Sequence, residues 1–290
     1  MSEPSRPREL EGKRALVTGA ARGFGRAVAH LLAEAGADVA VADLGGRPSR
    51  SPYPMAGRAE LERTVAELHD YGGQALAIEA DVTQAGDCER MAQEVIAGLG
   101  QIDILVANAG GATNAPVWEL TEADWDFVHE VCLKSVFLTT RAVIPHMIER
   151  RSGKIVLTAS RNGLRVEHGY AHYNAAKAGV IHYGKSLALE LGPYEVNVNV
   201  VCPTQMADKS RVPVANPEGQ KYWDQVAGHA GATYEEFDAA SGRDNLFESG
   251  GQPDFREVAE GVLWLVSERS RLVTGLALPM DAGWIVKRGG

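Results

Sequence analysis

Three side chains in the middle of the sequence, Ser160, Tyr173 and Lys177, are of types that can move a proton at a hydroxyl or carbonyl oxygen. Tyr173 and Lys177 stand four positions apart, and residues at that spacing share one face of a helix. A neighbouring ammonium favours the phenolate and lowers the pKa of a tyrosine, so Tyr173 could act as a general acid or base. Ser160 could hold the same oxygen by a hydrogen bond. The alternative is a simple pair on a helix surface, because this spacing is common.

A glycine-rich segment, Thr18–Gly25 (TGAARGFG), follows a short apolar run and precedes a stretch of helical periodicity. Glycines allow a tight turn and a close approach of the backbone to a pyrophosphate, and the helix N-terminus supplies free N–H groups. This order of elements is typical of dinucleotide-binding folds, although a plain strand–helix turn also contains glycine. The residues expected to contact a dinucleotide are Gly19, Arg22, Gly23, Phe24 and Gly25.

Asp43 ends the second apolar run and lies 18 positions after Gly25. A carboxylate at an offset of about 20 residues accepts hydrogen bonds from the adenosine ribose of a dinucleotide. It would repel a 2′-phosphate, so Asp43, with Leu44 beside it, favours NAD over NADP. Two alternatives stay open: Asp43 could cap a loop, and Arg47 or Arg50 could reach a 2′-phosphate.

Polar or small residues also follow the third and fourth apolar runs. Asp81–Val82 comes after the third run, and Asn108–Ala109–Gly110 comes after the fourth. Ligands of open α/β sheets bind at the carboxyl ends of the strands, so we expect both segments to contact the cofactor. Each could otherwise be ordinary turn chemistry.

Six short apolar segments alternate with segments of helical periodicity. Parallel strands buried on both faces are continuous apolar runs, and their alternation with helices predicts βαβ units. The predicted fold class is therefore α/β: a single Rossmann-type, doubly wound parallel sheet with helices on both faces. The predicted strands are Arg14–Thr18, Asp38–Ala42, Ala75–Glu79, Ile102–Ala107, Lys154–Ala159 and Glu195–Val201.

The remaining segments set the domain organisation. Residues 1–10 are expected to form a flexible arm, and residues 11–290 a single cofactor-binding domain. Residues 44–57 (LGGRPSRSPYPMAG) are typical of a loop between a strand and a helix. Residues 205–253 form an irregular insertion rich in aromatic residues. This insertion could close over a substrate as a lid, or its aromatics could pack it onto the body.

Composition narrows the function classes. The net charge of −9 argues against nucleic acid and anionic membranes as partners. Cys88, Cys132 and Cys202 have no CxxC spacing and no nearby histidine cluster, so we expect neither a disulfide framework nor a metal site. The polar N-terminal segment lacks an apolar h-region, and no apolar run approaches the length of a membrane span. We therefore expect a cytoplasmic protein.

Together, the motifs resemble the short-chain dehydrogenase/reductase family over about residues 10–285. The resemblance rests on TGAARGFG, Asp43, Asp81, the NAG at Asn108–Gly110, and Ser160 with Tyr173 and Lys177. It implies an NAD-dependent oxidoreductase that interconverts a small-molecule secondary alcohol and a ketone, with Pro203, Tyr173 and Lys177 also at the cofactor. The apolar end segment VTGLALPMDAG resembles the last strand of the family and implies a homotetramer.

A narrower resemblance comes from the insertion at 44–57 and the segment AHYNAAKAGV, which are similar to the actinobacterial carveol-dehydrogenase-like, mycofactocin-linked subgroup. Together with the aromatic insertion, it implies a bulky hydrophobic or cyclic substrate. Two positions depart from the family pattern. Cys132 stands where the family has an asparagine that helps to order a water behind the lysine, and Asp208 stands where a threonine contacts the nicotinamide carboxamide. Cys132 could alter proton delivery, or it could simply fill the core.

Two other functions stay open. Cys132 would suit an NAD-binding protein with reduced catalysis, such as a redox sensor or scaffold, although the intact Ser160, Tyr173 and Lys177 argue against it. An epimerase or dehydratase that recycles its NAD would use the same fold, but such enzymes need a larger substrate domain. His168 and His172 flank Tyr170 near the expected substrate mouth, and they are expected to be a loop residue and a helix-surface residue.

Overall fold

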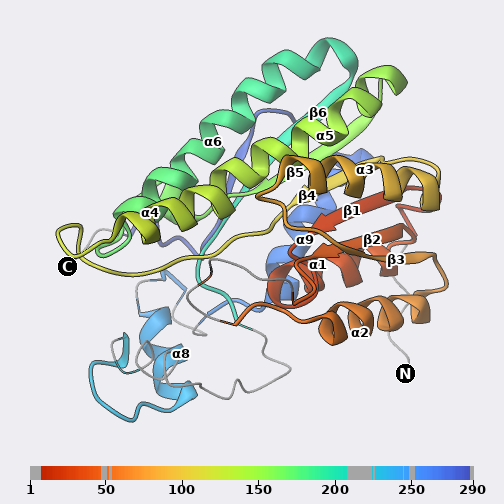
Figure 1. The fold of residues 1–290 in the computed structure, drawn as a ribbon. Helices are drawn as coiled ribbons and strands as arrows, with labels where there is room; N and C mark the ends of the chain where they lie inside the picture. Colours follow the sequence, from red (N-terminus) through yellow and green to blue (C-terminus); the bar gives the residue numbers. More distant parts are fainter. Residues whose placement is uncertain are drawn as a thin grey trace.

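A computed structural model describes residues 8–46, 51, 54–207, 224, 226–243, 245–247 and 252–287. Within them, seven strands form one sheet in the order β3-β2-β1-β4-β5-β6-β7 (Figure 1). All six pairings are parallel, which confirms the predicted fold class. The strands are β1 Arg14–Thr18, β2 Asp38–Asp43, β3 Ala75–Glu79, β4 Ile104–Ala107, β5 Gly153–Thr158, β6 Val196–Pro203 and β7 Ala277–Met280.

Helices cover both faces of the sheet, and each face has its own hydrophobic cluster (Figure 1). One cluster combines residues of α1 (Gly23–Glu34), α2 (Arg58–Leu68) and α9 (Phe255–Val266). The other combines residues of α3 (Ala85–Leu99), α5 (Ser135–Arg150) and α6 (Ala171–Leu191). The central strands are buried on both sides, which explains why their sequences are apolar throughout rather than alternating.

The strand order reverses beside β1, which pairs with β2 on one side and with β4 on the other. Open α/β sheets bind ligands at such a switch point, beyond the carboxyl ends of the strands. The predicted strands agree with the structure to within two residues at each end. The largest differences are at Ile102, which precedes β4, and at β6, which continues to Pro203 because it pairs with β7.

A long helical stretch leads from α4 (Glu122–His129) through a π-helical turn, Glu130–Lys134, into α5. Such π-turns are rare and often lie at functional sites. By length and composition alone, Glu122–Arg150 is apolar enough to cross a membrane, but half of its most apolar window is buried inside the protein. Buried core helices share this character, so it is weak evidence for a membrane segment.

The predicted insertion at 205–253 begins and ends beside the carboxyl edge of the sheet. Ala207 and Asp254 form an isolated parallel bridge, in which the backbone N–H of Ala207 donates to Pro253 at 3.1 Å. Within the insertion, α8 (Tyr234–Gly242) carries the buried Phe237. Asp208, Tyr222 and Trp223 lie outside the described residues, as do Arg47 and Arg50 of the earlier loop.

Candidate active site

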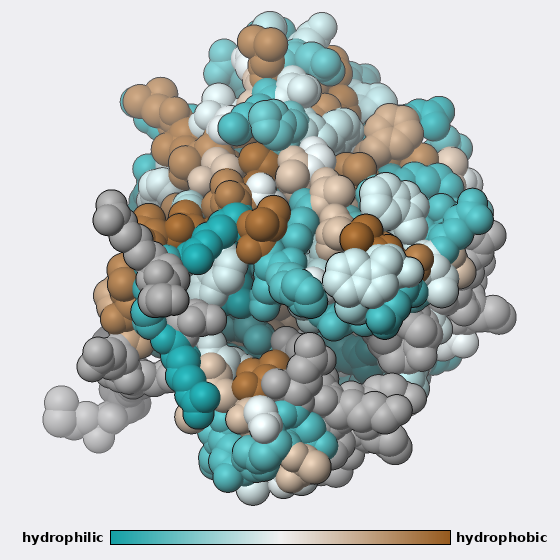
Figure 2. Space-filling model, turned by 90° about the vertical axis from the view of Figure 1, so that its left-hand side faces the viewer, coloured by the Kyte–Doolittle hydropathy of each residue, from teal (hydrophilic) through white to brown (hydrophobic). Residues whose placement is uncertain are grey.

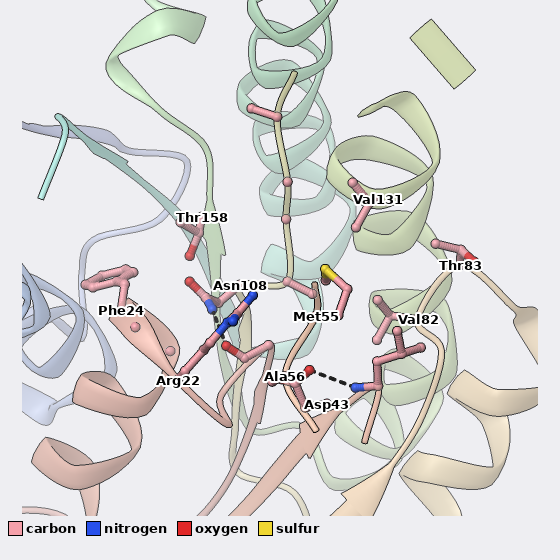
Figure 3. A pocket seen from close by; sticks show the side chains of 18 of the residues that line it. Arg22, Phe24, Asp43, Met55, Ala56, Val82, Thr83, Asn108, Val131 and Thr158 are labelled. Carbon is pink, nitrogen blue, oxygen red and sulfur yellow. Dashed lines mark hydrogen bonds between the residues drawn. The ribbon is translucent and has the colours of Figure 1, made fainter. Parts of the chain in front are cut away.

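One cavity of about 800 Å³ lies at the carboxyl ends of the central strands (Figure 3). Every residue that the sequence singled out for the cofactor or for catalysis lines it. Further lining residues were not foreseen, including Met55 and Ala56 of the loop after β2 and Thr158, the last residue of β5. The predicted lining residues are Gly19, Arg22, Gly23, Phe24, Gly25, Asp43, Leu44, Asp81, Val82, Asn108, Ala109, Gly110, Ser160, Tyr173, Lys177 and Pro203.

The glycine turn after β1 is closely packed against the loop after β4. A Cβ atom on Gly19 would lie 2.7 Å from the Cα of Ala109, and one on Gly25 would lie 2.3 Å from the carbonyl oxygen of Gly19. The Asn108 amide donates to the carbonyls of Thr18 and Gly19 at 3.0 and 3.1 Å. Asn108 therefore holds the glycine turn in shape from the next strand.

Helix α1 begins at Gly23, and its first three residues line the cavity. Its N-cap residue, Arg22, makes no side-chain capping hydrogen bond. Uncapped N–H groups and the positive end of the helix dipole suit an anion such as a pyrophosphate. Gly19, Gly23 and Gly25 all line the cavity, so the turn fits a dinucleotide.

Asp43 ends β2 and is 9% exposed. Its two carboxylate oxygens accept from the backbone N–H groups of Ala21 at 2.9 Å and Leu44 at 2.8 Å. Burial raises the pKa of Asp43, and these two hydrogen bonds act in the opposite direction. Each oxygen keeps a further lone pair, so the carboxylate can still accept from a ribose hydroxyl.

The loop after β2 folds back onto the glycine turn. The Arg22 guanidinium donates to the carbonyl of Pro54 at 2.8 Å, and the N–H of Gly46 donates to Ala56 at 3.0 Å. These contacts bring Met55 and Ala56 to the cavity wall, where Figure 3 shows them beside Asp43 and Val82. The unusual length of this loop was the only signal in the sequence for their position.

Asp81, after β3, builds a local turn at the cavity. Its carboxylate accepts from the N–H and the hydroxyl of Thr83 at 3.0 and 2.7 Å. The backbone N–H of Asp81 donates to Asp87 at 2.8 Å. The turn thus has its own structural role while it places Val82 and Thr83 along the cavity.

The predicted catalytic residues converge from β5 and α6. Lys177 is 3% exposed, and its ammonium donates to the carbonyl of Thr158 at 2.8 Å. The same ammonium lies 5.5 Å from the centre of the Tyr173 ring. Ser160 accepts from the N–H of Asn162 at 3.1 Å, which leaves its own O–H to donate. The three groups can therefore act on one substrate oxygen.

The pKa of Tyr173 differs from the sequence expectation. Burial raises the pKa above its usual range and outweighs Lys177 and a side-chain hydrogen bond with Ser160, which both lower it. The expected direction of the Lys177 effect is right, but the net direction is opposite. The desolvation has no signal in the sequence, because the depth at which this helix face is buried depends on contacts with distant segments.

Two asparagines that were not predicted from the sequence connect the turn after Ser160 to helix α6. The side chain of Asn162 donates to the side chain of Asn174 at 3.0 Å, and Asn174 donates to the carbonyl of Glu167 at 3.0 Å. Both residues are buried, and each is close in sequence to a catalytic candidate. This bridge fixes the positions of Ser160 and Tyr173 relative to each other.

Cys132 lies in the π-helical turn and is fully buried. Its thiol donates to the carbonyl of Gly111 at 3.0 Å and accepts from the N–H of the same residue at 3.4 Å. It packs in a cluster with Phe127 and Val131 of the same stretch. Cys132 therefore anchors the loop after β4 to the long helix.

His168 and His172 differ in how deeply they are buried. His168 is exposed in a loop, as expected. His172 is fully buried rather than on a helix surface, and a ring nitrogen lies 2.8 Å from the hydroxyl of Thr113. Burial lowers the pKa of His172, because the start of α6 is covered by the loop after β4. The other ring nitrogen has no hydrogen-bond partner.

The C-terminal segment is clamped to the turn after Ser160. The guanidiniums of Arg161 and Arg165 lie 4.0 and 4.8 Å from the centre of the Trp284 ring. Arg165 also donates to the carbonyls of Trp284 and Lys287 at 2.9 and 2.7 Å. The buried Arg161 thus has a cation–π partner, which offsets part of the cost of removing its charge from water.

Comparison with known proteins agrees with this architecture. A model of the short chain dehydrogenase family matches residues 13–216. The chain is 36% identical over 281 residues to (-)-trans-carveol dehydrogenase of Rhodococcus erythropolis, covering 96% of this chain and 99% of that protein. It is 37% identical over 282 residues to cyclohexanol dehydrogenase of Rhodococcus sp. (strain TK6), covering 94% and 96%. The crystal structure of carveol dehydrogenase from Mycobacterium avium in complex with NAD matches with a TM-score of 0.89 and 31% identity, covering 96% and 99%.

Proposed function

Because this chain belongs to the short chain dehydrogenase family, in its carveol-dehydrogenase-like subgroup, we propose that it interconverts a bulky or cyclic secondary alcohol and its ketone, with Tyr173 as acid and base. The protein is an NAD-dependent alcohol dehydrogenase or ketoreductase. The observation that carries the proposal is a single cavity that joins the glycine turn and Asp43 to Ser160, Tyr173 and Lys177.

In this proposal the bound NAD supplies the acceptor or donor of a hydride. Ser160 donates a hydrogen bond to the substrate oxygen and holds it beside Tyr173. Tyr173 takes the hydroxyl proton during oxidation and returns it during reduction. Lys177, held by the carbonyl of Thr158, stabilises the phenolate with its charge. The hydrogen bond between Asn162 and Asn174 holds Ser160 and Tyr173 in position relative to each other.

Two features support a bulky hydrophobic substrate. Phe127 and Val131 of the long helical stretch and Met206 of the loop after β6 line the cavity with Tyr173. Hydrophobic side chains also gather on part of the face shown in Figure 2. A hydrophobic alcohol would bury part of this apolar surface.

The test is Tyr173→Phe with Tyr183→Phe as the matched control. Tyr183 lies on the same helix, but its hydroxyl is paired with Thr140 at 2.8 Å, away from the cavity. We expect Tyr173→Phe to lose at least about 100-fold in kcat on cyclic alcohols while keeping its affinity for NADH. Tyr183→Phe should keep near-normal kcat. Near-normal turnover by Tyr173→Phe would mean that another group transfers the proton.

We further propose that the protein is a homotetramer, assembled through its long helices. A groove of about 550 Å³ runs between the α4–α5 stretch and α6 and is lined by Leu133, Phe137 and Tyr183, among others. Phe137 is 45% exposed there, and Leu189 of α6 is 82% exposed. A second copy of the chain would cover these apolar side chains. Light scattering at low micromolar concentration tests this proposal, and a stable active monomer would contradict it.

A further inference from the structure

The hydroxyl of Thr158 is a buried polar atom without a partner. Thr158 is the last residue of β5 and is 9% exposed, and its Oγ1 atom has no solvent contact and no hydrogen bond. Side chains alternate along a strand, so Thr158 faces the same side of the sheet as Val156 rather than the side of Leu157. Figure 3 shows its hydroxyl directed into the cavity, toward Asn108.

The polar groups next to the Thr158 hydroxyl already form other hydrogen bonds. Its carbonyl accepts from Lys177 at 2.8 Å, which fixes the backbone at this point. The amide of Asn108 donates to Thr18 and Gly19. Among the described residues, Thr158 is the only one that lines the cavity and carries a side-chain atom that is buried and unpaired. Buried polar groups normally have a partner, so a ligand of this cavity would supply the missing one.

We propose that the Thr158 hydroxyl forms a hydrogen bond with the nicotinamide half of NAD. The two ends of the cavity differ in their lining residues. Asp43 lies at the end expected to hold the adenosine ribose, and the start of α1 lies where the pyrophosphate is expected. Ser160, Tyr173 and Lys177 mark the other end, where the hydride must be exchanged. Thr158 is two residues from Ser160 and is bonded to Lys177, so its hydroxyl belongs to the nicotinamide end. The proposal rests on NAD use and is independent of the alcohol.

The test compares Thr158→Val with Thr158→Ser and with a control variant in helix α5. Valine has nearly the shape of threonine without its hydroxyl, and serine keeps the hydroxyl. The control is Thr140→Val: Thr140 is also buried, but its hydroxyl bonds to the carbonyl of Val136 and to the Tyr183 hydroxyl, both at 2.8 Å. NADH and ADP are titrated against each protein without substrate, and the melting temperature of each free protein is recorded.

We expect Thr158→Val to weaken NADH binding about three- to tenfold, which is the effect of one hydrogen bond. ADP, which lacks the nicotinamide half, should bind all four proteins equally. Thr158→Ser should stay within about twofold of the wild type for NADH. The free Thr158→Val protein should melt no lower than the wild type, because the lost hydroxyl had no partner. Thr140→Val should melt lower and bind NADH normally.

Three results would overturn the proposal. Unchanged NADH affinity in Thr158→Val would mean that the hydroxyl does not touch the cofactor. A lower melting temperature of free Thr158→Val would show that the hydroxyl stabilises the fold instead. Equal weakening of ADP and NADH would place the contact at the adenosine end. Since turnover is not measured, failure here leaves the role of Tyr173 untouched.

Discussion

Replacing Cys132 with alanine removes the thiol that ties the loop after β4 to the long helix. Two hydrogen bonds to Gly111 are lost, one donated at 3.0 Å and one accepted at 3.4 Å, along with the packing of a fully buried sulfur. Sulfur forms weak hydrogen bonds, so most of the cost comes from the unpaired Gly111 groups and the small cavity. We expect a loss of about 2 kcal/mol in the free energy of unfolding.

A loss of that size lowers the melting temperature of a chain of this length by roughly 3 °C. The assay is thermal unfolding of the free protein together with an NADH titration and kcat on a good alcohol. The affinity for NADH should change little, because Cys132 does not line the cavity. If the melting temperature is unchanged while kcat falls, the thiol acts on proton delivery behind Lys177 and not as an anchor.

Cys132→Asn is the complementary change, because it places an amide where the family resemblance expects one. The amide could donate to the Gly111 carbonyl and accept from the Gly111 N–H, as the thiol does now. We expect a melting temperature at or above that of the wild type, and a higher kcat if proton delivery limits turnover. A less stable and slower variant would refute this reasoning and show that the pocket is adapted to a thiol.

Further predictions concern the cofactor, the positioning bridge and the pH profile. Asp43→Ala should weaken NAD binding about 10- to 100-fold and reduce the preference for NAD over NADP, as measured by titrating both cofactors. An unchanged preference would mean that the arginines of the following loop, and not Asp43, determine the cofactor selectivity. Asn174→Ala should lower kcat several-fold with NADH affinity intact, because the bridge to Asn162 is lost; unchanged kcat would make the bridge purely structural. Lys177→Met removes a charge that lowers the pKa of Tyr173, so the rise of alcohol oxidation with pH should move to higher pH; a shift to lower pH would contradict the phenolate as base.

The strands and the cavity residues were predictable because both depend on local pattern. Arg14–Thr18 and Ala75–Glu79 are continuous apolar runs between turn residues, and both are strands with the predicted limits. The glycine turn and Asp43 follow such strands directly. Position in the sequence therefore fixed position at the sheet edge, since all carboxyl ends of a parallel sheet lie on one side.

What escaped prediction depends on contacts between distant segments. The pairing of His172 with Thr113 and that of Asn162 with Asn174 join different loops and helices, and neither leaves a pattern in its own segment. The net rise in the pKa of Tyr173 likewise reflects burial by surrounding elements. The predicted strand at Ile102 begins too early because Ile102 and Asp103 are buried outside the ladder, with the Asp103 carboxylate accepting from the backbone N–H of Arg14 at 2.8 Å.

The clamp on Trp284 has a practical consequence for work with this protein. Arg165 donates hydrogen bonds to the backbone carbonyls of Trp284 and Lys287, and Arg161 directly follows Ser160. Residues 284–287 are therefore held against the serine turn. A purification tag fused after Gly290 would be separated from Lys287 by only three residues. Loss of activity in such a fusion would report a displaced tail and not a defect in the chemistry. Kinetic comparisons between variants therefore call for an N-terminal tag or a cleaved one.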